Sequence, residues 1–342
     1  MDKLSIIIPV YNGERSIRYL LDDLSGLEIS HYEVIIVNDG STDTTESVIQ
    51  QYLLNNSHIK LVNQQNKGVS SARNHGMRVS EGKYITFLDA DDRINPLKFK
   101  EFFYEVVQAG AEYSFTGYIE RNFKTDTKKY VDSIGNGYYE LDSFMNVFFE
   151  NLKVNLISYP INKVFLKSII EENHLMFDEN IHFAEDLLFN LDYLNLSNSF
   201  YISDSNYYIY QKYLNENSLS SKFNMGFWES RKLVYEKLSL LEERAKKYKL
   251  FNLNKDTYAA NVIVYTSRQI VNQNKPIYLI IQDLKMFVKD EYLKKIISRE
   301  SNVTSRQKFL FDLLKKNKTY SIYFFWKLFE FKDKLEKLKS SL

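Results

Sequence analysis

The chain of 342 residues contains no cysteine. It therefore has no disulfide framework, no thiolate nucleophile and no zinc–sulfur site. Long apolar runs are also missing: no stretch of about 18 apolar residues occurs, and we expect no membrane-spanning helix. The first apolar run, Leu4 to Val10, is too short for a secretory signal and has no small-residue cleavage site after it. We expect a cytoplasmic protein, located either free in the cytoplasm or at the inner face of the membrane.

The chain also lacks an excess of positive or negative charge. The formal net charge is +1, so no long-range field steers the chain to nucleic acid, and we expect no nucleic-acid partner. Hydrophobic residues, in contrast, make up 44% of the chain. That fraction and the chain length are enough for one domain of about 200 residues and a smaller second domain.

Apolar runs alternate with segments of helical spacing through the first 90 residues. The expected strands cover residues 4–10, 32–37, 59–62 and 84–88, and the expected helices cover residues 16–27, 44–54 and 68–79. Such alternation predicts a mostly parallel, Rossmann-like α/β sheet with helices on both faces. Ligands bind beyond the carboxyl ends of the strands in such sheets. The loops at Tyr11, Asp39 and Asp89 follow three of these strands, so we expect them to converge.

The remaining chain divides near residue 222. Before it, the pattern predicts a helix and a strand in residues 97–118, a loop or hairpin in 123–140, a mainly helical segment in 141–196 and a strand in 200–210. After it, the sequence is charged, has helical spacing and contains almost no Gly or Pro. We predict a domain over residues 1–222, with a nucleotide half over about 1–118 and an acceptor half over about 119–222, and a helical domain over 223–342.

An acidic cluster ends the fourth expected strand. Asp89, Asp91 and Asp92 follow an apolar run directly. An Asp-x-Asp step places alternate side chains on one side of an extended chain, and two such carboxylates suit a hard divalent cation with oxygen ligands. An isolated pair of Asp residues is usually a solvated turn. Here the position after a buried strand favours a metal site that also binds a diphosphate.

Four further motifs each allow a structural and a functional interpretation. Gly68 begins an expected helix whose free N–H groups favour anions, and Arg73 is either a forked donor for phosphate or a surface cation. Asp39 either caps a strand-to-helix turn or accepts hydrogen bonds from a nucleobase or ribose. Tyr11 either stacks on a base or covers the edge of the core. The pair Glu185 and Asp186 is either a general base with a tuned pKa or the acidic start of a helix.

Taken together, these residues resemble the inverting glycosyltransferases of family 2, which have the GT-A fold. The resemblance extends over about residues 4–222 and rests on five short motifs in a specific order: Ile8-Pro9-Val10-Tyr11-Asn12, Val37-Asn38-Asp39-Gly40-Ser41-Thr42-Asp43, Asn66-Lys67-Gly68-Val69-Ser70-Ser71-Ala72-Arg73-Asn74, Phe87-Leu88-Asp89-Ala90-Asp91-Asp92 and Glu185-Asp186-Leu187-Leu188-Phe189. Asn162-Lys163 and the segment from Tyr208 to Ser220 also look like bacterial polysaccharide-type members.

The resemblance implies a role for each matching position. Asp186 is the expected catalytic base, and Glu185 shapes the acceptor pocket. Asp91, with Asp89, is the expected ligand of Mn²⁺ or Mg²⁺. The residues expected to bind the nucleotide-sugar are Pro9, Tyr11, Asn12, Asp39, Gly40, Ser41, Gly68, Arg73, Asp89 and Ala90.

The implied reaction moves one hexose or N-acetylhexosamine from a UDP-sugar to a hydroxyl group, with inversion and with a metal ion, in polysaccharide biosynthesis. The acceptor is a glycan or a lipid-linked or protein-linked glycan. The Gln-x-x-Arg-Trp motif of processive synthases is missing, so we expect one sugar per encounter. Where some relatives carry a His before the step that resembles Asn217-Ser218, this chain has Tyr213.

Two other functions remain open on the sequence: a sugar nucleotidyltransferase and a non-catalytic GT-A scaffold or binding protein. The first usually has a Gly-rich basic loop after its first strand, which Tyr11-Asn12-Gly13-Glu14-Arg15 does not supply. The presence of Asp91 and Asp186 argues against the second. A dinucleotide-binding domain is disfavoured because Gly-x-Gly-x-x-Gly is missing.

The C-terminal segment is basic and aromatic. From Arg306 onward ten basic residues face four acidic ones, a net charge of about +6. The segment from Tyr320 to Phe329 contains a run of aromatic residues between lysines. Such a helix either lies on an anionic membrane surface or packs within the protein or against a second subunit as a homo-oligomer.

Overall fold

The computed structural model describes residues 2–212, 225–245, 251–298 and 303–340. The chain forms two compact units. The first consists of Met1–Glu216 with Glu243–Tyr248, and the second of Asn217–Glu242 with Lys249–Leu342. Tyr213 and the Asn217-Ser218 step lie outside the described residues.

The described part of the first unit is built around one mixed, mostly parallel sheet of ten strands in the order β3-β2-β1-β4-β9-β6-β10-β5, with β7 beside β6 and β8 beside β10. β1 pairs in parallel with β2 and β4, β2 with β3, and β6 with β10. The strands are β1 (Leu4–Val10), β2 (Tyr32–Asp39), β3 (Ile59–Gln64), β4 (Tyr84–Phe87), β5 (Arg93–Ile94), β6 (Tyr113–Asn122), β7 (Lys128–Val131), β8 (Gly137–Glu140), β9 (Lys163–Leu166) and β10 (Ser199–Lys212).

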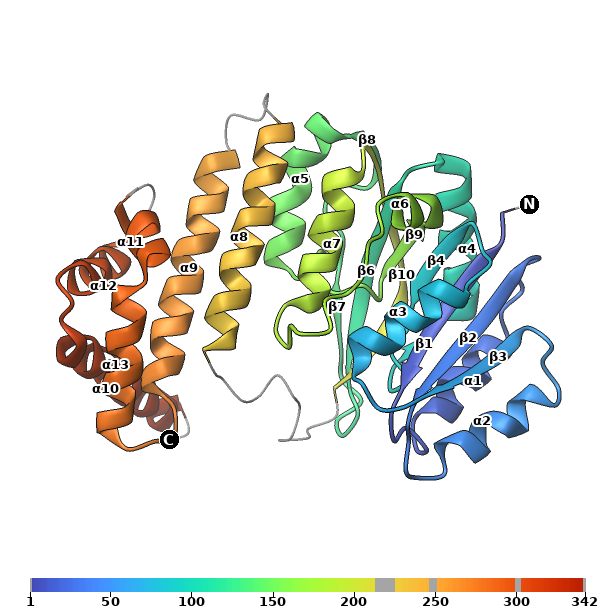
Figure 1. Cartoon of the computed structure of the whole chain (residues 1–342), viewed down its shortest axis with the longest axis horizontal. Coiled ribbons are helices and arrows are strands. Elements are labelled where there is room, and N and C mark those ends of the chain that lie inside the picture. Colours follow the sequence, from blue (N-terminus) through green and yellow to red (C-terminus); the bar gives the residue numbers. More distant parts are fainter. Residues whose placement is uncertain (1, 213–224, 246–250, 299–302, 341–342) are drawn as a thin grey trace. The chain divides into compact units, whose positions relative to one another are not determined.

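Helices cover both faces of this sheet. The chain runs outward from β1 through β2 to β3, and then returns to place β4 on the other side of β1. Because crossovers between parallel strands are right-handed, this reversal puts α3 on the face opposite α1 and α2; Figure 1 shows α3 in front of β1. The helices are α1 (Ile17–Ser25), α2 (Thr45–Leu53), α3 (Val69–Val79), α4 (Pro96–Ala109), α5 (Leu141–Lys153), α6 (Lys167–Glu172) and α7 (Glu185–Leu196).

The hydrophobic core lies on both sides of the central strands. All seven residues of β1 are buried, as expected for a strand covered on two faces. Next to β4, an aromatic cluster joins three elements: the Phe87 ring meets the rings of Phe165, Phe177 and Phe189 edge to face, and Phe177 stacks on Phe189 with centroids 4.0 Å apart. This cluster supports the start of α7.

The four strands expected in the first 90 residues are present, whereas the sequence pattern did not predict two short strands. β9 lies inside the segment expected to be mainly helical, and β5 has two residues. β5 is too short to show any alternation, and the short apolar run of β9 forms a strand only because it pairs antiparallel with β4 and β6. In residues 123–140, β7 forms a hairpin with β6, and β8 pairs instead with β10.

The second unit is helical, as the sequence predicts for this region. Its core contains Trp228, Ile263, Leu284, Phe287 and Trp326, all at most 2% exposed. Among the described residues, none of the helices combines the length and the apolar character that crossing a bilayer requires. The helices that build this unit are α8 (Gly226–Arg244), α9 (Phe251–Val271), α10 (Ile277–Lys289), α11 (Glu291–Ser298), α12 (Ser305–Lys315) and α13 (Thr319–Ser340), coloured yellow to dark red in Figure 1.

Candidate functional site

The loops after β1 and β2 meet at the carboxyl edge of the sheet, as parallel pairing requires. The backbone N–H of Asn12 donates to Ser41 Oγ (2.9 Å), and the N–H of Thr42 donates to Asn12 Oδ1 (2.8 Å). Asn12 has φ of 50°, in the left-handed region that Asn tolerates better than most residues. Tyr11 beside it is 51% exposed, so its ring does not cover the edge of the core and is accessible to a ligand.

Asp39 at the end of β2 connects this edge to the start of α3. Its carboxylate is buried and accepts hydrogen bonds from Gln64 Nε2 (2.8 Å), the Lys67 N–H (2.9 Å) and the Gly68 N–H (2.8 Å). Gly68 has φ of 91°, which favours glycine at this position. Asp39 therefore braces the turn into α3. A carboxylate has about four acceptor positions, and one remains for the predicted contact with a nucleobase or ribose.

Arg73 on α3 connects two acidic residues from distant segments. Its guanidinium donates from one terminal nitrogen to Asp89 Oδ1 (3.0 Å) and from the other to Asp186 Oδ1 (2.7 Å). The residue is only 3% exposed, and its guanidinium lies over the Phe177 ring, 5.3 Å from the centroid. Burial disfavours the charged form, but the negative charges of Asp186 and Asp89 outweigh it and raise the pKa of Arg73. Arg73 is thus an internal bridge rather than a surface cation.

Asp186 lies in the first turn of α7, after a residue in an unfavourable conformation. Ala184 has φ of 61° and ψ of 18°, a left-handed backbone that costs an L-residue about 1–2 kcal/mol. Ala184 is the residue directly before α7, so Glu185 and Asp186 are the first two residues of the helix. Burial raises the pKa of Asp186 to about 7, Arg73 opposes the shift, and the charges of Glu185 and Asp89 add to it. A carboxylate with a pKa near neutrality is suited to accept a proton.

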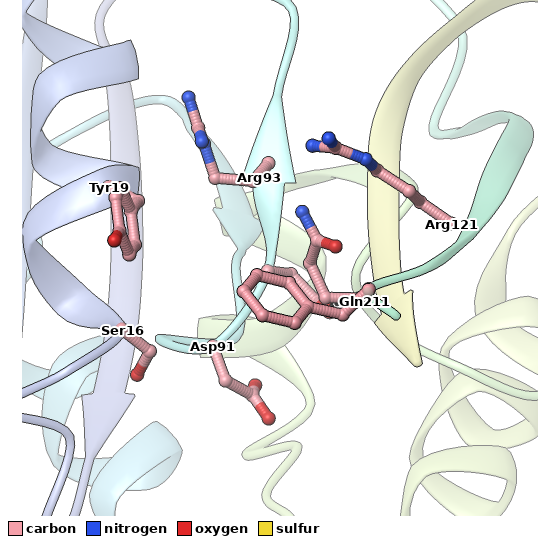
Figure 2. Close-up of a pocket in the computed structure, with 8 residues that line it drawn as sticks. Ser16, Tyr19, Asp91, Arg93, Arg121 and Gln211 are labelled. Carbon is pink, nitrogen blue, oxygen red and sulfur yellow. Dashed lines mark hydrogen bonds between the residues drawn. The ribbon is translucent and has the colours of Figure 1, made fainter. Parts of the chain in front are cut away.

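Asp91 differs from Asp89 and Asp186 because it has no ion pair among the described residues. It is exposed but lines a hollow in the surface. Loss of surrounding water, together with the charge of Asp89, raises the pKa of Asp91 to about 6. In Figure 2 its carboxylate points away from the guanidinium groups of Arg93 and Arg121. A cation at this carboxylate would relieve the repulsion that raises its pKa.

The hollow beside Asp91 is small and mixed in character. Its volume is about 140 Å³, below the roughly 300–1,000 Å³ of pockets that enclose a whole small molecule. It therefore accommodates only part of a ligand, and the predicted nucleotide-sugar would lie mainly along the open edge of the sheet. The residues around it come from the start of α1, the loop after β4, β5, the end of β6 and β10. They are Ser16, Tyr19, Asp91, Asp92, Arg93, Arg121, Phe123 and Gln211.

Asp92 does not share the environment of Asp91, although it is the next residue. It is 1% exposed; the Tyr208 hydroxyl donates to its Oδ2 and the Gln211 N–H to its Oδ1 (2.7 Å). The Tyr208 oxygen also accepts from the Asp89 N–H (3.4 Å). Burial and then the charges of Asp91 and Asp89 raise the pKa of Asp92 well above its usual value. Asp92 and Tyr208 thus fasten the acidic loop to β10.

This fastening yields a testable expectation. Tyr208→Phe removes one of the two hydrogen bonds of a buried carboxyl group, which costs about 1–3 kcal/mol. We expect the thermal midpoint to fall by several degrees, at about 2–4 °C per kcal/mol for a domain of this size. Tyr130→Phe, which removes an exposed hydroxyl on β7, is the matched control. Equal melting of the two variants would contradict the proposed role of the Tyr208 hydroxyl.

Lys163 is another residue to which the sequence motifs assign no role. It is fully buried in β9, and its Nζ donates to the carbonyl oxygens of Leu156 and Tyr159 and to Asn162 Oδ1. Burial holds the pKa of Lys163 well below its usual value, and the nearby charge of Asp186 opposes that shift. The Asn162-Lys163 motif was the only hint of this residue in the sequence. That Lys163 supports the loop before β9 becomes visible only in the fold.

The structure gathers most of the predicted residues at one edge. Asp89 and Asp186 both contact Arg73, Asp91 is close to Asp89, and Asn12 contacts Ser41. Pro9 and Ala90 are largely buried backbone positions. Gly40 has φ of 70°, and an added Cβ would lie 2.8 Å from the Asn66 nitrogen, so glycine fits the turn. Glu185 borders Asp186 on α7. These placements do not test the roles of the residues, which stay predictions.

The fit of a divalent cation follows from the acidic loop itself. No group of three or more His, Cys, Asp or Glu residues with metal-binding geometry occurs among the described residues. Asp89 and Asp91 supply two carboxylates, one of which shares an oxygen with Arg73. Mg²⁺ is commonly bound by one or two carboxylates, with waters and substrate phosphates completing its shell. The residues present fit a cation of that kind and do not form an all-protein cage.

Comparisons with known proteins point to one family. The model of "Glycosyl transferase family 2" matches residues 5–173. The "Uncharacterized glycosyltransferase EpsJ" of Bacillus subtilis is 31% identical over 219 residues, which cover 64% of this chain and 62% of EpsJ. The "Poly(ribitol-phosphate) beta-N-acetylglucosaminyltransferase TarS" of Staphylococcus aureus is 26% identical over 242 residues, covering 68% of this chain and 40% of TarS. The chain thus spans less than two thirds of the length of either relative.

Solved structures are similar over nearly the whole chain. S. aureus TarS 1-349 in complex with UDP-GlcNAc has a TM-score of 0.72 at 20% identity, covering 96% of this chain and 91% of that one. The same TarS segment in complex with UDP has a TM-score of 0.68 at 18% identity, with the same coverage of both chains. This likeness confirms the predicted fold class, a GT-A-like α/β sheet with a helical C-terminal region.

Proposed function

The chain belongs to glycosyl transferase family 2, and from that membership we propose that it transfers one sugar from a UDP-sugar to a hydroxyl group of a glycoconjugate acceptor. The observation that carries the proposal is the Arg73 bridge, which joins Asp89 of the acidic loop to Asp186. A donor-side acid and a base are thereby held at one place. The likeness to a TarS structure with bound UDP-GlcNAc supports a UDP-sugar as donor and N-acetylglucosamine as the first sugar to test.

Asp186 takes the proton of the acceptor hydroxyl in this proposal. A hydroxyl is a weak nucleophile, and a carboxylate with a pKa of about 7 is basic enough to accept its proton at neutral pH. As it loses its proton, the acceptor oxygen attacks the anomeric carbon from the side opposite the diphosphate. The bond between the anomeric carbon and the diphosphate breaks, so the configuration inverts in a single displacement. Arg73 orients Asp186 and stabilises its negative charge through the 2.7 Å contact.

The diphosphate side of the proposed site uses the acidic loop. Asp91 and Asp89 would hold Mn²⁺ or Mg²⁺, which supplies charge stabilisation to the leaving diphosphate when bound. The Asp92–Tyr208 contact and the Asp89 N–H keep this loop against β10. Tyr11, Asp39 and the first turn of α3 border the open edge on which the nucleoside would lie, with Tyr11 accessible for stacking.

The acceptor is proposed at the level of its class. The names of the relatives support a glycan or a related polymer as acceptor: TarS is, by its name, a poly(ribitol-phosphate) beta-N-acetylglucosaminyltransferase. Two family-level alternatives, a sugar nucleotidyltransferase and a scaffold without activity, remain for experiment. A sugar nucleotidyltransferase would form a nucleotide-sugar from a sugar phosphate and a nucleoside triphosphate, and a scaffold would turn over neither substrate.

A screen of UDP-sugars tests this function. UDP-Glc, UDP-Gal, UDP-GlcNAc and UDP-GalNAc are incubated with the protein and Mn²⁺, and released UDP is measured. We expect slow hydrolysis of one donor above the rest, accelerated by the correct acceptor and abolished by a chelator. Pyrophosphate release from UTP and a sugar phosphate would instead favour the nucleotidyltransferase. Failure to bind or hydrolyse any donor in the presence of metal would overturn the proposal.

A further inference from the structure

Helix α13 is apolar on two faces, of which only one is covered. On the inner face, Ile322 and Trp326 are 0% and 2% exposed, and Trp326 Nε1 donates to Ser267 Oγ (3.1 Å). On the other face, four large apolar side chains are 59–69% exposed, namely Tyr320, Phe324, Leu328 and Phe331. We call these four residues the outer stripe of α13.

The spacing of the outer stripe makes it continuous. Its residues follow one another at intervals of four, four and three positions, which places them on one side of an α-helix. A helix that is hydrophobic all round normally has both sides buried. Single exposed apolar residues are common on protein surfaces, but a contiguous set marks a binding surface more often. The outer stripe therefore calls for a partner outside the described fold.

The charge around the outer stripe identifies the partner. Between Arg306 and Asp333 the described sequence has seven basic and three acidic residues, a net charge of +4. The acids are engaged: Asp312 pairs with Lys316 (2.8 Å), Glu330 with Lys327 (2.7 Å) and Asp333 with Arg268 (2.7 Å). Lys318, which directly precedes α13, and Lys332, which directly follows Phe331, are both exposed. An apolar stripe within a segment of net positive charge is complementary to an anionic surface.

A second copy of the chain fits this surface less well. In a twofold interface the same patch faces itself, so two segments of net positive charge would come together, and like charges at an interface are unfavourable. An anionic lipid surface offers the opposite charge. It also accepts Phe, Leu and Tyr side chains at the boundary between headgroups and acyl chains.

We propose that the outer stripe of α13 binds an anionic membrane surface, with the helix lying in the plane of the membrane. Its aromatic and leucine side chains enter the interface, and the lysines contact the lipid headgroups. This binding does not depend on the proposed transferase activity. If the activity is as proposed, it would bring the enzyme to a surface that carries lipid-linked acceptors.

Vesicle flotation tests the proposal. The full chain is mixed with vesicles of phosphatidylcholine alone or of phosphatidylcholine with phosphatidylglycerol, and the floating fraction is measured. We expect binding to the anionic vesicles, weakening as salt screens the lysines. The double variant Phe324→Gln, Leu328→Gln should bind at least about tenfold more weakly, because it loses two apolar groups from the interface. Glutamine keeps the helical propensity of these exposed positions.

A matched control removes two exposed leucines elsewhere. Leu54→Gln, Leu97→Gln changes residues that are 85% and 62% exposed in the first unit, and it should float like the unchanged protein. Equal thermal midpoints establish that both variants are folded. The proposal is overturned if the unchanged protein ignores anionic vesicles or if the α13 variant floats equally well. It is also overturned if light scattering shows a dimer that this variant dissociates, because a second copy then covers the stripe.

Discussion

Replacement of Asp186 by Asn is expected to slow sugar transfer strongly while leaving UDP binding in place. The amide keeps the shape of the carboxyl group but has no basicity for the acceptor proton. Loss of a general base lowers rates by about 10²–10⁴-fold, so kcat should fall within that range. Binding of UDP, measured by calorimetry in the presence of Mn²⁺, should change little because the acidic loop is untouched.

The pH profile of the unchanged protein offers a second measure of the same assignment. Burial raises the pKa of Asp186 to about 7, so the carboxylate form that accepts a proton predominates only above that pH. The transfer rate should therefore fall as the pH drops from 8 to 6. The remaining activity of Asp186→Asn should lack this step. A step that persists in the variant would assign the ionisation to another group.

The same substitution should make the fold more stable. Because the pKa of Asp186 is higher in the folded chain than in the unfolded chain, ionisation favours unfolding. This loss of stability begins near pH 4, grows as the pH rises, and is complete above about pH 7. The thermal midpoint of Asp186→Asn should thus exceed that of the unchanged protein at pH 8 and approach it near pH 4.

The matched control is Asp204→Asn, which changes an exposed carboxylate on β10. It should transfer sugar normally and melt as the unchanged protein does at every pH. Normal transfer by Asp186→Asn, in contrast, would exclude Asp186 as the base. If Asp186→Asn loses UDP binding instead, the residue acts on the donor and not on the acceptor hydroxyl.

Replacement of Asp91 by Ala is expected to remove the metal dependence of UDP binding. Asp91 has no ion pair among the described residues, and its raised pKa reflects lost water and the charge of Asp89. A cation held there offsets that repulsion and attracts the diphosphate. Loss of an outer-shell partner of a metal ligand typically lowers metal affinity by about 10–100-fold. We expect Asp91→Ala to lower the affinity for UDP in Mn²⁺ by at least this factor, to the level that the unchanged protein shows in the presence of a chelator.

Two comparisons make this result specific to Asp91. Asp92→Asn changes the adjacent carboxyl group, which is buried against Tyr208, and should alter the melting temperature more than the metal dependence. Asp204→Asn should alter neither. Metal-dependent UDP binding that survives in Asp91→Ala would disprove the metal assignment while leaving the family and the fold unaffected.

Much of the first unit was predictable from local patterns. The strands of the first 90 residues are continuous apolar runs whose two faces are both covered, and the helices between them have regular spacing. Since parallel strands present their carboxyl ends at one edge, the convergence of the loops at Tyr11, Asp39 and Asp89 follows from the topology alone. β5 and β9 were not predictable, because β5 has only two residues and β9 becomes a strand through its pairing with β4 and β6.

The sequence by itself determined the family, the α/β architecture, the identities of the acidic and basic side chains, and the apolar character of α13. The tertiary structure decided how these groups meet. Arg73 is 113 residues from Asp186, and Tyr208 is 116 residues from Asp92, so neither pair leaves a local pattern. The pKa values of Asp91 and Asp186 and the exposure of the outer stripe also arise only on folding, because desolvation and charge proximity depend on which segments pack together.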